Sequence, residues 1–147
     1  MAEDLSRWIG KKETRYDAVT LSPAQRMLAT LDDMTTALSE GSPLPPLWHW
    51  LYFLSDTPMN TIGPDGHPKR GGFLPPIELP YRMFAGAHFI FHFPLLIGKK
   101  ARRESKILSI DHKEGRNGPL IFVNISHEIF QGGKLCMEEQ CDLVYLS

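Results

Sequence analysis

Pro-Leu-Pro-Pro-Leu-Trp-His-Trp-Leu-Tyr-Phe-Leu, residues 43–54, is the stretch that decides the fold. Its prolines favour an extended chain up to Pro46, where a helix can begin, because proline is tolerated in the first helical turn. From there the apolar residues follow the helical spacing i, i+3, i+4 and i+7: Leu47, Trp50, Leu51 and Leu54. A helix with almost no polar face should be buried. We therefore expect a short central helix with a sheet wrapped around it and His49 at its entrance.

The composition is that of one globular domain. A chain of 147 residues, 42% of them hydrophobic and 22% charged, is long enough to bury a real core. The net charge of −1 gives no electrostatic reason to expect nucleic acid. No apolar run is long enough to span a membrane, and residues 1–6 lack the pattern of a signal peptide. We expect a single cytoplasmic domain over residues 1–147, with neither nucleic acid nor membrane as a partner.

Cysteine and histidine spacing argues against a metal site. Cys136 and Cys141 are five apart in a strand-like segment, so their side chains should point to opposite faces, and their spacing is not that of a zinc site. We expect both thiols to be reduced. His88 and His92 would share a strand face, but no third ligand is evident, so no metal is expected. Three further histidines are expected at the surface: His67, His112 and His127.

The first half of the chain mixes extended, helical and loop signals. Residues 14–21 read as a strand or an extended lead-in. Ser22-Pro23 predicts a helix start, with Ser22 as the N-cap and proline at the first helical position. Residues 55–72 form a long loop with a turn at Gly63-Pro64-Asp65-Gly66. Long loops inside compact domains are often functional.

The second half alternates in the manner of an antiparallel meander. Strands are expected over residues 84–93, 99–112, 120–130 and 134–146, with hairpin turns at 114–119 and 131–133. The apolar stripe in residues 84–93 is expected to be core or interface. Early helices followed by such a meander indicate an α+β fold with an antiparallel sheet.

Several motifs together resemble one family. They are Trp8-Ile9-Gly10 and the segments 45–54, 63–68, 70–76, 82–86 and 114–120. They resemble the N-terminal half of MaoC-like acyl-thioester hydratases, in the branch of fatty-acid-synthase-type dehydratases that includes mesaconyl-CoA and itaconyl-CoA hydratases. The resemblance implies a single hot-dog fold, in which an antiparallel sheet wraps a central helix. It also implies an acyl-CoA or acyl-carrier thioester as substrate, no separate cofactor, and a homodimer or heterodimer with a second hot-dog subunit.

Hydration of an enoyl thioester needs a base for water, an acid for the α-carbon and donors for the enolate oxygen. In the family the Asp and His of the reaction lie on the second hot-dog, and these residues contain no Asp followed by Asn-Pro-x-His. His49 is the catalytic candidate here, although neither Glu40 nor Asp56 has the spacing of a partner. The alternative is a core histidine that is hydrogen-bonded to a backbone carbonyl.

The resemblance also indicates residues that would bind the substrate or coenzyme A: Trp48, Trp50, Arg70, Gly71, Gly72, Phe73 and Arg82. Gly72 matches a backbone amide that would face the thioester. A basic run could contact coenzyme A phosphates or form a solvated strand face: Lys99, Lys100, Arg102, Arg103 and Lys106. Two other functions remain open, a hot-dog thioesterase and a non-catalytic subunit of a hydratase complex.

Overall fold

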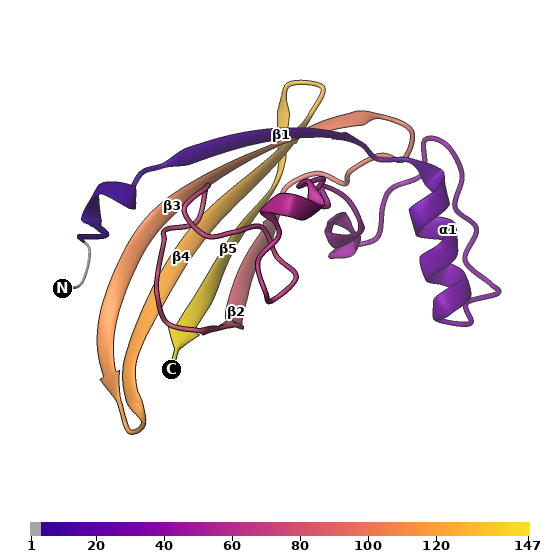
Figure 1. Cartoon of the computed structure of the whole chain (residues 1–147). Helices are drawn as coiled ribbons and strands as arrows, with labels where there is room; N and C mark the ends of the chain where they lie inside the picture. The colour runs from indigo at the N-terminus through magenta and orange to yellow at the C-terminus, as the bar shows by residue number, and fades with distance from the viewer. Residues whose placement is uncertain (1–3) are drawn as a thin grey trace.

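The computed structural model describes residues 4–147 and is built on one five-stranded antiparallel sheet (Figure 1). The strand order across the sheet is β1-β3-β4-β5-β2. The strands are β1 (Lys12–Ala18), β2 (Tyr81–Phe91), β3 (Lys100–Gly115), β4 (Gly118–Gln131) and β5 (Lys134–Leu146). The sheet is strongly curved, and the segment between α1 and β2 lies on its concave side (Figure 1). Every strand that the sequence predicted overlaps one of these five.

Two tight hairpins join β3, β4 and β5, as the sequence predicted. Gly115 pairs with Gly118 across a two-residue turn, and Gln131 pairs with Lys134 across Gly132-Gly133. Both glycines of the second turn have positive φ, 57° and 74°. A two-residue turn with two positive φ angles matches the right-handed twist of the flanking strands. The paired glycines therefore fix the β4–β5 register.

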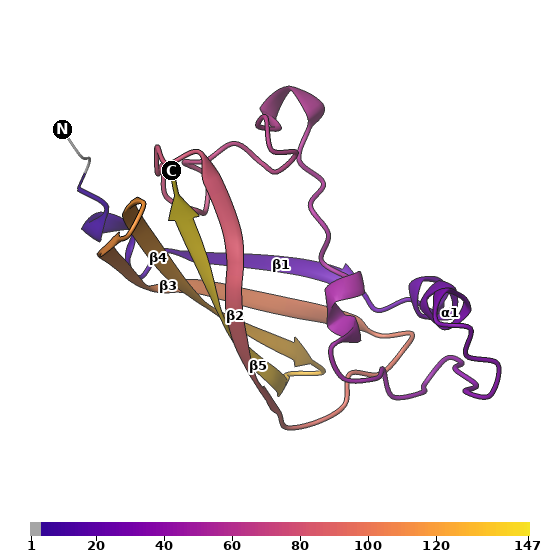
Figure 2. The ribbon, with the colours of Figure 1, turned by 90° about the horizontal axis from the view of Figure 1, so that it is seen from below.

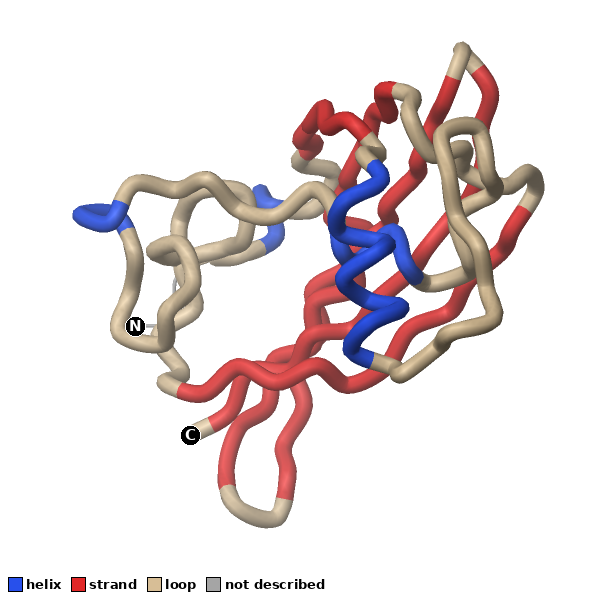
Figure 3. The backbone as a smooth tube through the Cα atoms, turned by 90° about the vertical axis from the view of Figure 1, so that its right-hand side faces the viewer, coloured by secondary structure: helices blue, strands red, loops and turns tan. Residues whose placement is uncertain are grey.

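The α-helix α1 (Leu21–Thr30) lies beyond one end of the sheet (Figure 2). Seen from that end, it crosses in front of the strand ends (Figure 3). Its N-cap is Thr20, without a side-chain hydrogen bond, so the expectation of Ser22 as N-cap was wrong. Backbone bonds between Val19 and the 98–99 segment hold the chain up to Val19, and the helix starts directly after it. No helix within residues 4–147 is long and apolar enough to cross a membrane.

The predicted central helix is absent from residues 47–54. A single 3-10 turn, η2 (Trp48–Leu51), stands in its place. Leu47 and Phe53 have φ of 75° and 57°, left-handed values that interrupt an α-helix on both sides of the turn. Tertiary bonds hold this shape, because Tyr52 Oη donates to the Thr20 carbonyl and Phe53 N–H donates to Asp17. The apolar spacing was therefore misleading, and three of its four residues are exposed: Leu47, Trp50 and Leu54.

The interior divides into two apolar clusters. The first lies towards α1 and η2 and includes Val19, Ala24, Leu44, Tyr52, Phe53, Ile97, Ile129 and Met137. The second lies towards the β3–β4 hairpin side and includes Leu5, Ile77, Ile107, Val123, Ile125, Cys141 and Tyr145. Both cysteines are buried and free. The two clusters leave a band of polar side chains between them.

Strand β2 is an edge strand with an unusually apolar exterior. It pairs only with β5 in the sheet, and a register shift occurs between Phe84 and Gly86. Large apolar side chains on and beside it are exposed: Tyr81, Met83, Phe84, Ile90, Phe91 and Phe93. The predicted strand is confirmed, but much of its apolar stripe faces outward. An exposed apolar edge of this kind invites pairing with another chain.

Candidate functional site

A row of polar residues crosses the inner face of the sheet. Glu13, Ser105, His127 and Glu139 are direct cross-strand neighbours on β1, β3, β4 and β5, and Phe89 of β2 completes the row. Apolar positions flank it on either side: Ile107, Ile125 and Cys141, and Ile129 and Met137. Polar groups buried between apolar side chains need hydrogen-bond partners. Ionisable groups that cluster in such an interior are typical of functional sites, so this row is the candidate site.

Glu139 is the centre of the row. It is 6% exposed, and its carboxylate accepts hydrogen bonds from His49 Nε2 at 2.8 Å and from Trp50 Nε1 at 3.2 and 3.3 Å. Burial alone would raise the pKa of Glu139, but the bond from His49 and the nearby His127 outweigh it, so the pKa is lowered. An ionised carboxylate only accepts hydrogen bonds, so the hydrogen of His49 sits on Nε2.

The η2 turn sets the position of His49. The turn lies between Leu47 and Phe53, which both have positive φ. In this turn the side chain of His49 is only 5% exposed. Phe89 packs edge-on against the imidazole, with ring centroids 5.9 Å apart. Left-handed conformations cost energy in residues with a side chain, and they cluster at functional sites.

The second imidazole nitrogen of His49 is unsatisfied. Nδ1 is buried and has no hydrogen-bond partner among residues 4–147. In the neutral ring with hydrogen on Nε2, Nδ1 is an acceptor, and leaving it unpaired costs about 1–3 kcal/mol. His49 also lines a cavity of about 340 Å³. The other walls are mainly apolar and include Leu44, Leu47, Phe91, Phe93, Leu95 and Met137.

His127 is half-buried on the inner face of the sheet, so its expected surface position was wrong. Its Nδ1 lies 2.6 Å from Ser105 Oγ, and its Nε2 lies 3.8 Å from Cys141 Sγ. Burial and, to a smaller extent, the charge of Arg103 together lower the pKa of His127 to about 4. Burial, followed by the charge of Glu139, raises the pKa of Cys141 to about 12. At neutral pH both side chains are uncharged.

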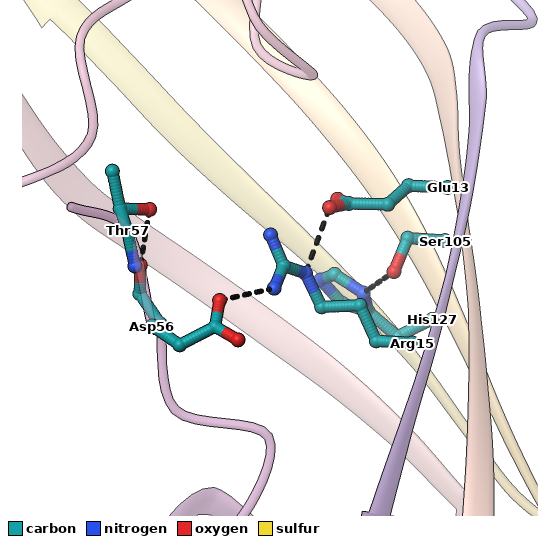
Figure 4. A network of polar contacts seen from close by, with 7 residues as sticks. Glu13, Arg15, Asp56, Thr57, Ser105 and His127 are labelled. Carbon is teal, nitrogen blue, oxygen red and sulfur yellow. Dashed lines mark hydrogen bonds and ion pairs between the residues drawn. The ribbon is translucent and has the colours of Figure 1, made fainter. Parts of the chain in front are cut away.

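Arginines border the row on the β1 side. Glu13 accepts a hydrogen bond from Arg15 Nε at 2.8 Å, and Arg15 also reaches Asp56 at 3.4 Å (Figure 4). This contact with Glu13 raises the pKa of Arg15. Arg103, directly opposite Arg15, lies over the ring of Phe53 at 5.3 Å, and burial lowers its pKa.

Strand alternation divides the predicted basic run. Arg103 is half-buried near the polar row, whereas Lys99, Lys100 and Lys106 are exposed. Arg102 lies over Phe130 and pairs with Glu104. The run is therefore not one continuous cationic face.

The other predicted binding residues lie in two groups. Trp48 packs on the first apolar cluster, and Trp50 is half-exposed beside Glu139. Phe73 packs on the second cluster. The structure thus brings Trp50 and His49 together on Glu139, whereas Phe73 belongs to the opposite half of the interior.

The guanidinium groups of Arg70 and Arg82 both make contacts within the chain. Arg70 donates to the carbonyls of Ile77, Leu79 and Pro80 and lies over the ring of Tyr145. Arg82 pairs with Asp65 at 3.5 Å.

The two glycines of this loop have separate roles. Gly71 has a φ of 95°, and its N–H donates to the carbonyl of Leu74, while the carbonyl of Gly72 accepts from Lys11 Nζ.

The sequence did not identify Glu139 as a site residue. Its only signal was a carboxylate at an inward position of β5 between Met137 and Cys141.

Comparison with solved structures defines the class of fold. The chain superposes on a subunit of the ChsH1-ChsH2 complex from Mycobacterium tuberculosis with a TM-score of 0.68 and 14% identity, over 92% of this chain and 88% of that one. It matches the (R)-hydratase from A. caviae involved in PHA biosynthesis with a TM-score of 0.53 and 14% identity, over 95% and 96%. The protein is therefore a hot-dog domain, which confirms the predicted fold class.

Sequence comparison then defines the family. The model of hydroxyacyl-thioester dehydratase type 2 matches residues 47–147, so the chain belongs to that family. The chain is also 51% identical over 142 residues to a mesaconyl-C(4)-CoA hydratase of Chloroflexus aurantiacus, which covers 97% of this chain and 51% of the relative. It therefore spans about half the length of that curated relative.

Proposed function

We propose that this chain is one hot-dog domain of an acyl-CoA hydratase/dehydratase that interconverts enoyl and 3-hydroxyacyl thioesters. The observation that carries the proposal is the 51% identity to a CoA hydratase across 97% of the chain. The family match points to the same reaction class. A short, branched dicarboxylic acyl-CoA such as mesaconyl-CoA is the first substrate to test.

A second hot-dog domain would complete the enzyme. The chain spans about half of its hydratase relative, and the structural neighbour with the TM-score of 0.68 comes from a two-component complex. The exposed apolar edge at β2 supports association, either as a homodimer or with a different hot-dog. A cytoplasmic location fits the two free cysteines.

His49 is the proposed catalytic residue of this chain. Trp48 and Trp50 flank it in η2 and would contact the acyl group. The loop with Arg70, Gly71, Gly72 and Phe73, together with Arg82, is the proposed contact for coenzyme A. Because the Arg70 and Arg82 side chains already bind within the chain, they would act chiefly by shaping the loop.

The test is a hydration assay of the complete assembly, with this chain and its second hot-dog domain present. Enoyl-CoA consumption and free thiol release are measured together on mesaconyl-CoA, crotonyl-CoA and longer enoyl-CoAs. The proposal expects loss of the enoyl double bond without thiol release. Thiol release without hydration would indicate a thioesterase, and inactivity on every substrate would contradict the proposal.

A further inference from the structure

We propose that Arg103 and Arg15 bind a carboxylate on the acyl group of the substrate, so that this chain favours a dicarboxylic over a monocarboxylic acyl thioester. This inference rests on the proposed function and adds the residues that would select the acyl group. The two arginines are direct cross-strand neighbours on β3 and β1. They lie two residues along each strand from the polar row, so their side chains share its inner face. Figure 4 shows Arg15 between the carboxylates of Glu13 and Asp56.

Arg103 is a cation without a hydrogen-bonded anion. Its guanidinium is half-buried over the ring of Phe53, with Cζ 5.3 Å from the ring centre. Its Nε is enclosed and has no partner among residues 4–147, and Glu13 and Glu139 act on it through their charges alone. Buried charges are normally paired, and a guanidinium has five N–H donors to satisfy. Because Nε is enclosed, an added anion would accept from the terminal Nη groups.

The neighbouring carboxylates already accept from other donors. Glu139 accepts from His49 Nε2 and Trp50 Nε1. Glu13 accepts from Arg15 Nε at 2.8 Å. Like charges directly opposite each other on paired strands are destabilising, so the two arginines repel each other. A carboxylate bound between them would remove this repulsion and pair the cation on β3.

A hollow of about 520 Å³ borders the arginine pair. Its wall includes Arg15 and Phe53, the two residues that flank Arg103, and also Asp56. Asp56 reaches Arg15 only at 3.4 Å, and its side chain is 92% exposed. Exposed ion pairs of this kind contribute little, so a ligand carboxylate would displace Asp56 from Arg15. The volume is in the range of small-molecule sites, which leaves room for a short acyl chain.

The charge around the pair favours a carboxylate over a phosphate. The two positive charges of the arginines face the negative charges of Glu13 and Glu139, and His127 is uncharged at neutral pH. One further negative charge is therefore easier to accommodate than the two of a phosphate ester. Guanidinium groups also bind carboxylates through two parallel hydrogen bonds. The phosphates of coenzyme A are the other source of an anion, and the experiment separates the two.

The experiment measures kcat/KM of the complete assembly on fumaryl-CoA and crotonyl-CoA, which have a carboxylate and a methyl group at the same position. Arg103→Gln should lower kcat/KM at least about tenfold on fumaryl-CoA and less than about twofold on crotonyl-CoA, because only fumaryl-CoA has the acyl carboxylate. Arg102→Gln is the matched control, because Arg102 lies on the opposite face of β3 over Phe130, and it should change neither value. Equal losses on both substrates would indicate a contact with the coenzyme A phosphates. That result, or an unchanged rate on fumaryl-CoA, would overturn the carboxylate site.

A second readout does not need turnover. Succinyl-CoA and butyryl-CoA, the saturated counterparts of the two substrates, are titrated calorimetrically into the assembly. Wild type should bind succinyl-CoA at least about tenfold more tightly, Arg103→Gln should lose this preference, and Arg103→Lys should keep part of it, because lysine retains the charge without the two-pronged geometry. Equal wild-type affinities for the two ligands would overturn the proposal. An assembly that hydrates no enoyl-CoA but keeps an Arg103-dependent preference for succinyl-CoA would remove the proposed function and leave the carboxylate site standing.

Discussion

At the scale of the residue, the titration of His127 should make the free energy of unfolding depend on pH. Its pKa is lowered to about 4, whereas an unfolded histidine titrates near 6.5. Below pH 6.5 His127 therefore binds a proton in the unfolded chain but stays neutral in the folded chain. The free energy of unfolding falls as the pH is lowered, until about pH 4. We expect this group to remove up to about 3 kcal/mol between pH 7 and pH 4.

Urea unfolding of wild type and His127→Gln across this range measures the effect. Acidic groups contribute to acid destabilisation in both proteins, so the difference between the two curves isolates His127. A wild-type curve parallel to that of His127→Gln would contradict the assignment.

Glu139 should matter for folding. Glu139→Ala leaves the N–H groups of His49 and Trp50 without their acceptor, so the free energy of unfolding should fall by about 2–4 kcal/mol. Glu139→Gln keeps an acceptor oxygen and should cost less. Denaturant titration of both variants checks this order, and equal stabilities for Glu139→Ala and wild type would show that the contact is not formed.

The partner of His49 could not be found from the sequence. Spacing rules compare residues that are neighbours along the chain, and by that measure Glu40 and Asp56 were the nearest carboxylates. Glu139 comes close only because four strands pair in register and η2 folds onto their inner face. The identity of His49 as a candidate was visible, but its chemistry depends on tertiary structure.

At the scale of the element, local signals predicted the meander well. Alternation and turn residues gave β2 to β5 with ends within a few residues, because hairpins are set by nearby positions. The Trp-rich segment failed for the opposite reason. Its helical spacing was overridden by bonds from Tyr52 and Phe53 to the end of β1 and the residues that follow it.

The Gly132-Gly133 turn offers a test of this local control. Gly133 has a φ of 74°, and a Cβ added there would meet no atom within 4 Å, so any penalty is conformational. Gly133→Ala should lower the free energy of unfolding by about 1 kcal/mol, and Gly133→Asn by less, because asparagine tolerates positive φ better. Thermal unfolding of the two variants measures the difference, and a Gly133→Ala protein as stable as wild type would refute the turn assignment.

At the scale of the whole molecule, the exposed edge of β2 should be the association surface. Ile90→Lys places a charge among exposed apolar side chains there and should weaken assembly at least about tenfold. Leu54→Lys, which changes another exposed aliphatic residue but lies outside the sheet, is the control. Sedimentation velocity across a concentration series gives the dissociation constants, and equal values for Ile90→Lys and wild type would place the interface elsewhere.

Reconstitution tests most directly whether this hot-dog domain takes part in hydration. The rate of enoyl-CoA hydration is measured for the second hot-dog domain alone, with this chain, and with this chain carrying His49→Gln. We expect this chain to restore hydration, and we expect the His49→Gln chain to assemble but to restore little of it. Full activity of the second domain alone, or equal rescue by wild type and His49→Gln, would contradict a catalytic role for this hot-dog domain.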